Sequence, residues 1–319
     1  ASDVLAQEKP ALRIPDRIRL AEAFRLGQNL GEKVWKGWNQ IPFAVLLVTT
    51  DFEFLVRHPN PSKDFTSADY DSLLKSEVYF RKRVYQPNLL ATFPAVNGIP
   101  TIVVGTPENT SKTSSAWVVT LLHEHFHQLQ MSRPTYSSEV ESLGLARGDK
   151  TGTWMLNFPF PYDSAEVKNR FSVLARLLSD ALQSAKAEDF RAKLSTYLEA
   201  RKRFCEILSP GDYNYFSFQL WQEGIALYTE YCISHLAAEK FKPSEEFTSM
   251  GDYTSFADVA RLTLQNIRLE LSRLSLENYR RVAFYYVGAG EALLLDVVNS
   301  SWREKYFTDK FFVERYFVK

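Results

Sequence analysis

The chain has 319 residues, in which 38 Lys and Arg residues balance 38 Asp and Glu residues. A net charge of zero without a basic run argues against nucleic-acid binding, because affinity for phosphates needs a concentrated positive surface. The apolar content of 45% excludes a disordered chain. No apolar stretch approaches the roughly 18 residues that cross a bilayer. We therefore expect a soluble globular protein without a transmembrane segment.

The start of the chain, Ala-Ser-Asp, has no initiator Met and no charged leader followed by an apolar run. Two explanations are open: export to the periplasm or the cell exterior after removal of a signal peptide, or trimming of the sequence. Cys205 and Cys232 are too few for a disulfide scaffold. We expect both to be free thiols, with a single disulfide between helices as the alternative.

The N-terminal part combines a helix with a small sheet. Apolar residues recur at helical spacing from Ile14 to Trp38, and Pro15 suits a first helical turn. Short runs rich in β-forming residues follow at 43–49, 89–96 and 101–105. Asn97-Gly98 between the last two is a strong hairpin signal. These runs predict a small, mostly antiparallel sheet.

The rest of the chain has helical periodicity from Ser114 onward, broken by a stretch rich in Gly, Pro and Ser at 132–164. The predicted helices after this break are 165–186, 188–208, 216–239, 255–274 and 279–298. We predict an α+β fold that is mainly helical. Its N-terminal α/β lobe spans 1–132, and a larger helical lobe spans 133–319.

Three of the five histidines lie in one five-residue window, HEHFH. His123 and His127 are four residues apart and share one helix face, so both imidazoles can reach one metal ion. Glu124 is rotated by about 100° from His123 and is placed to contact a water molecule rather than the ion. Zinc lowers the pKa of water towards about 7, and a neighbouring carboxylate can accept the proton during attack on a carbonyl.

The surrounding residues make this interpretation stronger than an isolated pattern match. The helix is apolar nearly all round, which predicts that it is buried. Burying two imidazoles and a carboxylate without partners would cost several kcal/mol, and a shared metal ion satisfies them. His125 points elsewhere on the helix, and we expect it to pack or to support the site rather than to bind metal.

A catalytic zinc site needs three protein ligands and an open position. Gln130 and Arg133 stand where a metzincin would have Gly and His, which excludes that class. A Glu from a second helix is the usual alternative, and Glu223 is the best candidate. Glu230, two turns further on, is placed to accept the free N–H of a ligating histidine.

The two segments together, His123-Glu-x-x-His127 and Glu223-Gly-x-Ala-x-Tyr-x-Glu230, resemble the gluzincin metallopeptidases of thermolysin-like fold. The second segment is most similar to that of the zinc aminopeptidases, with Gln222 in place of their Asn. We interpret the chain as a divergent member of this class. The resemblance implies a zincin-like fold, with the zinc helix in the N-terminal lobe and Glu223 in the helical lobe.

The same resemblance implies two further features of the site. Tyr285-Tyr286-Val-Gly288 is similar to the Tyr-x-x-Gly segment of the aminopeptidases, which makes Tyr285 the candidate donor to the developing oxyanion and Tyr286 the next choice. In a thermolysin-like fold an edge strand before the zinc helix pairs with the substrate backbone, and 101–105 is our candidate. Glu108, in a segment similar to the amine-binding motif of that group, is a weaker candidate.

The sequence thus predicts a zinc-dependent metallopeptidase that acts on a peptide or protein. His123, His127 and Glu223 bind the metal, Glu124 is the general base, Tyr285 stabilises the oxyanion and Glu230 orients a ligand. Two alternatives are open: a catalytically silent binding protein that keeps the fold and the metal, and a zinc hydrolase of a non-peptide substrate.

Overall fold

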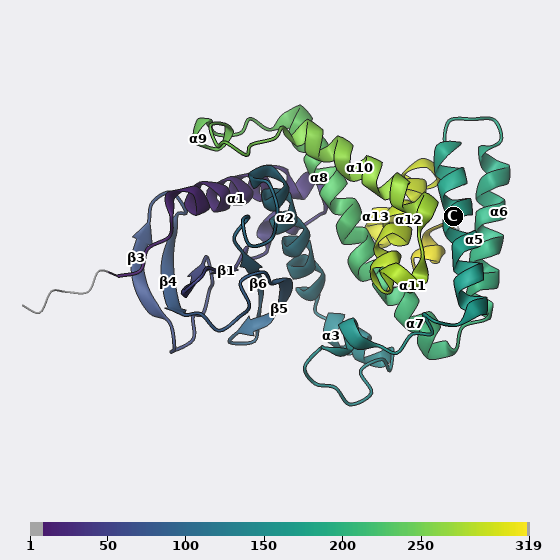
Figure 1. Cartoon of the computed structure of the whole chain (residues 1–319), viewed down its shortest axis with the longest axis horizontal. Helices are drawn as coiled ribbons and strands as arrows, with labels where there is room; N and C mark the ends of the chain where they lie inside the picture. The colour runs from purple at the N-terminus through teal and green to yellow at the C-terminus, as the bar shows by residue number, and fades with distance from the viewer. Residues whose placement is uncertain (1–8, 318–319) are drawn as a thin grey trace, which may run out of the picture. The chain divides into compact units, whose positions relative to one another are not determined.

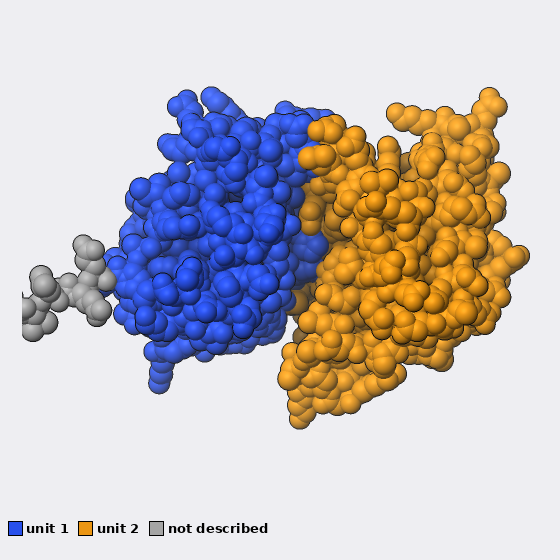
Figure 2. Space-filling view, viewed as in Figure 1, with its two compact units in different colours: residues 1–129, 233–259 blue, residues 130–232, 260–319 orange. Residues whose placement is uncertain are grey.

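The computed structural model describes residues 9–317 of the chain. The first three residues, on which the question of export or trimming rests, lie outside the described residues. The chain forms two compact units, one of residues 1–129 and 233–259 and the other of 130–232 and 260–319 (Figure 2). The predicted division after residue 132 lies beside the first of these boundaries and stays a prediction.

A six-stranded mixed sheet forms the centre of the first unit, in the order β3-β4-β2-β1-β6-β5 (Figure 1). Its strands are β1 (Val45–Val48), β2 (Phe52–Val56), β3 (Thr66–Asp71), β4 (Ser76–Lys82), β5 (Leu90–Val96) and β6 (Ile99–Gly105). Neighbouring strands are antiparallel except β1 and β6, which run parallel. The sheet is therefore mostly antiparallel, as expected, but larger than the three runs that the sequence indicated.

The hairpin between β5 and β6 turns at Asn97 and Gly98, with φ angles of 46° and 73°. Two positive φ angles define a type I′ turn, so the Asn-Gly prediction is confirmed. The hairpin leaves β5 at the sheet edge and β6 inside, between β1 and β5. The expectation that 101–105 is an edge strand is therefore wrong. Its apolar run is buried on both faces, whereas β5 carries Pro94, which suits an edge because it lacks an N–H.

Helices α1 (Ile14–Val34) and α2 (Ser114–Met131) belong to this unit, apart from the last two residues of α2. They pack closely, because a Cβ added to Gly27 of α1 would lie 3.3 Å from a methyl group of Leu122 and 3.2 Å from the Phe43 ring. The indole of Trp117 in α2 donates to the carbonyl oxygen of Gly105 at 2.8 Å. This contact ties the start of α2 to the end of β6.

The segment 233–259 joins the first unit although it is distant in sequence. Asp252 accepts hydrogen bonds from the backbone N–H of Ser114 at 2.8 Å and from its hydroxyl at 2.6 Å. The carboxylate thus caps the first turn of α2, where unsatisfied N–H groups and the helix dipole favour a negative charge. Ser115 also donates to the carbonyl of Thr254. The short helix α9 (Glu245–Thr248) lies in the same segment.

The second unit is helical. Its longer elements are α5 (Ala165–Gln183), α6 (Phe190–Glu206), α7 (Pro210–Gln219), the π-helical turn η2 (Leu220–Gly224), α8 (Ile225–Lys240), α10 (Phe256–Arg273) and α12 (Val282–Val298), of which α8 and α10 extend into the segment 233–259. Shorter helices and turns complete the chain: η1 (Trp38–Gln40) in the first unit, and α3 (Tyr136–Ser142), α4 (Trp154–Asn157), α11 (Leu276–Tyr279), α13 (Trp302–Lys305) and η3 (Val313–Phe317) in the second. The predicted α+β class with a helical C-terminal region is confirmed.

Helix α12 packs against η2 through two glycines. A Cβ on Gly224 would lie 2.5 Å from the Cα of Gly288, and one on Gly288 would lie 2.6 Å from the carbonyl oxygen of Leu220. Neither position has room for a side chain, because the obstructing atoms belong to the backbone. The predicted helix 216–239 is thus interrupted by a π turn that rests against α12.

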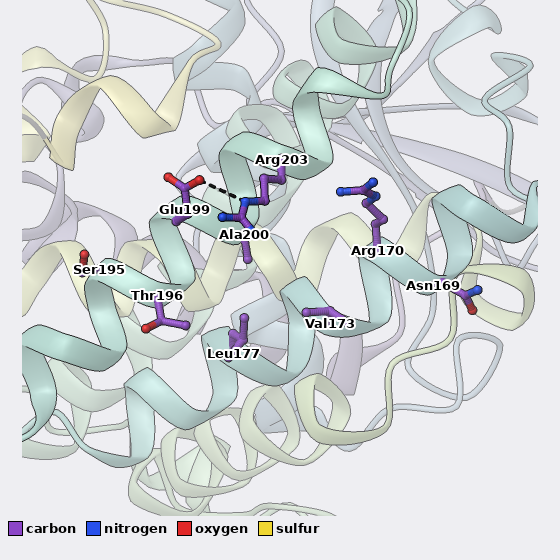
Figure 3. Close-up of a pocket in the computed structure, with 9 residues that line it drawn as sticks. All are labelled: Asn169, Arg170, Val173, Leu177, Ser195, Thr196, Glu199, Ala200 and Arg203. Atoms are coloured by element: carbon purple, nitrogen blue, oxygen red, sulfur yellow. Dashed lines mark hydrogen bonds and ion pairs between the residues drawn. The ribbon is translucent and has the colours of Figure 1, made fainter.

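Helices α5 and α6 form an antiparallel pair with an open groove of about 620 Å³ between them (Figure 3). Its lining combines apolar groups such as Val173 and Leu177 with the charged side chains of Arg170, Glu199 and Arg203. Arg203 donates to Glu199 at 3.0 Å.

Cys205 and Cys232 are both free thiols, as expected. Among the described residues, no helix combines the length and apolar character that crossing a membrane demands.

Candidate metal centre

His123 and His127 lie on one face of α2 with their Nε2 atoms 3.1 Å apart. Both side chains are buried, His123 being 8% exposed. One candidate ligand atom from each of His123, Glu124 and His127 lies within 4.8 Å of the others. The helix therefore brings together these three residues as the sequence spacing predicted.

Glu124 is 6% exposed and is held by a residue of the neighbouring edge strand. The hydroxyl of Thr92 in β5 lies 2.8 Å from Oε2 of Glu124 and 3.0 Å from its backbone carbonyl oxygen. A hydroxyl has one proton, so it donates to one of these oxygens at a time. Thr92 therefore restricts the position of the carboxylate relative to the helix. The spacing of residues in the sequence did not reveal this contact.

Glu223 lies in the π turn η2 of the second unit and is half-buried. Gln130, three residues after His127 on α2, donates through its side-chain amide to the carbonyl oxygens of Gln222 at 3.0 Å and Trp221 at 3.3 Å. The same amide group is 2.7 Å from the hydroxyl of Tyr306. The last turn of α2 is thus hydrogen-bonded to the main chain beside Glu223.

Tyr285 contacts Glu223 and Arg281 within the second unit. Its phenol accepts a hydrogen bond from the Arg281 guanidinium, and its side chain is hydrogen-bonded to Glu223. Burial raises the pKa of Tyr285 well above its usual value, and the neighbouring Glu223 carboxylate raises it further. In this arrangement the phenol joins Arg281 to the candidate ligand.

Tyr286 and Glu230, the other candidates in this unit, have different surroundings. The Tyr286 ring contacts the Tyr279 ring edge-on at 6.2 Å between centroids, and its side chain is hydrogen-bonded to Asn266. Of the two tyrosines, Tyr285 is therefore the one hydrogen-bonded to Glu223. Glu230 is half-buried on α8, and its predicted role in orienting a ligand stays a prediction.

His125 lies outside this group of candidate ligands. Its ring stacks on Phe43, with centroids 3.9 Å apart, and its Nδ1 is 2.8 Å from Oε1 of Gln128. Burial lowers the pKa of His125 to about 4, so the imidazole is neutral at pH 7. These contacts agree with the expectation that His125 packs rather than joins the candidate ligands.

Glu108, the weak candidate for binding an amine, is paired with two arginines. Its carboxylate lies 3.0 Å from Arg13 and 3.3 Å from Arg19. Burial alone would raise the pKa of Glu108. Hydrogen bonds from its own backbone N–H and the Thr106 hydroxyl, together with Arg13, outweigh this effect and lower the pKa to about 2. A carboxylate already engaged with two cations is poorly placed to bind a substrate amine.

The donor set on α2 fits a zinc ion. Two nitrogens that bind one tetrahedral zinc at about 2.0–2.1 Å lie about 3.3 Å apart, close to the observed 3.1 Å between the Nε2 atoms of His123 and His127. Facing imidazole nitrogens at this distance need a proton or a cation between them. Buried imidazoles with a neighbouring carboxylate are also the ligand types that zinc prefers.

Comparison with known proteins adds nothing to this geometry. No protein-family model, no curated protein and no solved structure matches the chain. The interpretation therefore rests on the residues themselves. Sequence reasoning missed Thr92 altogether. It also missed the contacts that Gln130 makes to the turn of Glu223 and that Arg281 makes to Tyr285.

Proposed function

We propose that the protein is a zinc-dependent metallopeptidase of the gluzincin type, with a zincin-like arrangement of its zinc helix. The observation that carries the proposal is the pair of buried imidazoles with Nε2 atoms 3.1 Å apart, next to the buried carboxylate of Glu124. A purely structural metal site has no need for a base beside it. The combination therefore favours a hydrolase over a metal-binding scaffold.

His123 and His127 would hold the ion through Nε2. When bound, zinc supplies a Lewis acid that polarises the substrate carbonyl and makes water a better nucleophile at neutral pH. Glu124 accepts a proton from the attacking water and then donates it to the leaving amine. Thr92 holds Glu124 in position for both transfers through its contact with Oε2.

We propose Glu223 as the third ligand. The support is the hydrogen bonding of Gln130, on the last turn of α2, to the carbonyl oxygen of Gln222. Tyr285 is hydrogen-bonded to Glu223 and receives a hydrogen bond from Arg281, so it has two proposed tasks. Before attack its single proton is donated to the Glu223 carboxylate and orients it, and during attack the phenol releases Glu223 and donates the same proton in a hydrogen bond to the oxyanion of the substrate.

The edge strand β5 is the proposed site for the substrate backbone, replacing the inner segment 101–105. The free edge of β5 offers N–H and C=O groups to an extended peptide, and such pairing tolerates many sequences. Thr92 links this strand directly to Glu124. A peptide paired with β5 would thus lie along the strand that positions the proposed base.

The test compares wild-type protein with Glu124→Gln, Glu223→Ala and His235→Ala. Zinc content is measured by elemental analysis, and cleavage is measured on a peptide library. We expect Glu124→Gln to keep its zinc and to lose cleavage by a factor of about 10² or more. Glu223→Ala should lower zinc affinity. His235 is an exposed histidine paired with Glu239 at 3.5 Å, so its removal should change neither property.

Three results would contradict the proposal. Equal cleavage by wild type and Glu124→Gln would indicate a contaminating peptidase. Zinc that remains at wild-type affinity in Glu223→Ala would exclude this residue as third ligand. Zinc binding without cleavage of any peptide would favour the scaffold protein or a hydrolase with a non-peptide substrate.

A further inference from the structure

Arg281 of the second unit has hydrogen-bonding capacity that its contact with Tyr285 leaves unused. The residue lies directly before α12, and its side chain is half-buried. Its Nη1 donates to the Tyr285 phenol, and in the described part of the chain this is the hydrogen bond that the guanidinium makes. The edge of the guanidinium that carries Nε and Nη2 therefore remains free.

The free edge of Arg281 is accessible and has a defined geometry. Both Nε and Nη2 reach solvent, because neither is among the buried polar atoms without a hydrogen-bond partner. These two nitrogens direct parallel N–H bonds to one side, a fork that binds the two oxygens of a carboxylate at the same time. A planar anion is thus the ligand that this edge fits.

The charges around Arg281 leave it without a counter-ion of its own. The phenols of Tyr162 and Tyr215 lie near it and are neutral at pH 7, because burial raises the pKa of Tyr162 to about 12 and that of Tyr215 further. The carboxylate that acts most strongly on Arg281 is Glu223, through the Tyr285 phenol between them. If Glu223 binds zinc, its charge serves the metal, and a half-buried cation without an anion is costly.

The preceding Arg280 differs from Arg281 in this respect. Its guanidinium lies over the Tyr162 ring at 4.8 Å and 3.6 Å from the carboxylate of Asp163. Arg280 is also exposed. Of these two neighbouring arginines, Arg281 is therefore the one with a free fork and an unbalanced charge.

These observations assign a ligand to the fork. Resting on the proposed function, we propose that Arg281 binds a carboxylate of the peptide substrate through Nε and Nη2. Tyr285 is the proposed donor to the oxyanion and contacts Arg281, so this carboxylate lies close to the bond that is cleaved. A peptide can supply it from its C-terminus or from an acidic side chain. The favoured substrates are therefore peptides cleaved near a free C-terminus or near an acidic residue.

The test measures peptide binding to the zinc-loaded Glu124→Gln protein by calorimetry, so that binding is separated from cleavage. One pair of probes is N-acetylated trialanine with a free carboxyl end and its C-terminal amide. The second pair is the same amide with glutamate or glutamine in the middle position. In at least one pair, we expect the carboxylate peptide to bind about tenfold more tightly than its neutral counterpart. A preference in the first pair identifies the terminal carboxylate, and one in the second identifies the acidic side chain.

Further variants of the same protein show whether Arg281 is responsible. Arg281→Gln removes both the charge and the fork and should abolish the preference. Arg281→Lys keeps the charge but loses the two parallel donors, so it should retain only part of the preference, and it replaces the first variant if that one fails to fold. Arg176→Gln removes an exposed arginine that is paired with Asp180 at 3.4 Å, and it should bind the peptides like the parent protein.

The proposal is overturned if neither carboxylate peptide binds more tightly than its neutral counterpart. It is also overturned if the preference is undiminished in the Arg281 variants, which would assign it to the metal ion or to another cation. Failure of the proposed function has a different signature. If the wild type cleaves no peptide but Arg281→Gln loses the preference, the carboxylate site stands without a peptidase. A protein that takes up no zinc would overturn both proposals.

Discussion

Substitution of Gly288 by Ala tests how the turn that carries Glu223 is held. The Cβ of the new alanine would lie 2.6 Å from the carbonyl oxygen of Leu220 and 2.8 Å from the Cα of Gly224. Both obstructing atoms belong to the backbone of η2, so no side-chain rotation relieves the contact. Helix α12 and the turn must move apart instead.

The magnitude follows from a comparison with Gly290, two residues further along α12. There the nearest atoms to a Cβ would be side-chain methyl groups of Leu178 and Leu271, both at 2.9 Å. Overpacking costs about 1–3 kcal/mol, whereas alanine in place of glycine inside a helix gains about 1 kcal/mol. We expect Gly288→Ala to lose about 2 kcal/mol in free energy of unfolding and Gly290→Ala to remain within about 1 kcal/mol of the wild type.

The assay is urea unfolding of the three proteins, followed by tryptophan fluorescence, with zinc affinity measured on the folded proteins. The unfolding midpoint of Gly288→Ala should fall below that of Gly290→Ala at similar slope. If Glu223 is the third ligand, displacement of its turn should also weaken zinc binding in Gly288→Ala. Gly290→Ala, which leaves the turn in place, should bind zinc like the wild type.

Equal unfolding midpoints for the two variants would refute the argument that backbone contact at Gly288 decides the packing of α12. A Gly288→Ala protein that is less stable but binds zinc with unchanged affinity would keep the packing argument. It would, however, contradict the proposed link between this turn and the metal.

Three further predictions concern side-chain contacts that the fold brings together. Thr92→Val should lower kcat about tenfold or more with unchanged zinc content, because Glu124 loses a hydrogen bond. Thr92→Ser keeps the hydroxyl and should retain activity. Equal kcat in the two variants would contradict this role of Thr92. Gln130→Leu should lower the free energy of unfolding by about 2 kcal/mol and weaken zinc binding, as urea unfolding and zinc titration would show, because it removes the buried amide that donates to the carbonyl oxygen of Gln222 and contacts the Tyr306 hydroxyl. Glu291→Ala should cost about 3 kcal/mol in urea unfolding, because it removes the carboxylate that lies 2.5 Å from the buried guanidinium of Arg201.

Local sequence patterns were enough to predict the features that depend on local physics. The helical period predicted most of the long helices to within a few residues, because each must bury one face. Asn97-Gly98 predicted its hairpin, since few other residue pairs adopt two positive φ angles. The spacing of His123 and His127 predicted their contact, because helix geometry alone places i and i+4 on one face.

Features that depend on long-range pairing were not visible in the sequence. Strand β3, Thr66–Asp71, is mostly exposed and polar, so it lacks the apolar alternation that marks a strand, and it exists because β4 pairs with it. The π turn at Leu220–Gly224 interrupts an otherwise helical pattern, and the residue against which it packs, Gly288, lies far along the chain. The order of β5 and β6 was predictable in principle, because Pro94 favours the sheet edge.

The candidate site likewise combines residues that local spacing predicted with residues that only the folded chain brings near. His123, Glu124 and His127 come from one helix turn and could be found by spacing. Thr92 is 32 residues from Glu124, and Gln130 is 92 residues from Gln222, so only the folded chain reveals their contacts. Residues that position a site are usually distant in sequence, because a rigid support has to come from a different element.

The histidine pair of α2 differs from the other buried polar residues of this helix in the kind of contact that it makes. Glu124 accepts from Thr92, His125 contacts Gln128, and the two protons of the Gln130 amide are shared among three oxygen atoms, so each of these buried groups has an uncharged partner. The pair of His123 and His127 differs in kind, because two imidazole nitrogens face one another at 3.1 Å. Two lone pairs at this distance repel unless a proton or a metal ion lies between them. A proton would satisfy the two rings alone, whereas a zinc ion also gives the buried carboxylate beside them a chemical role.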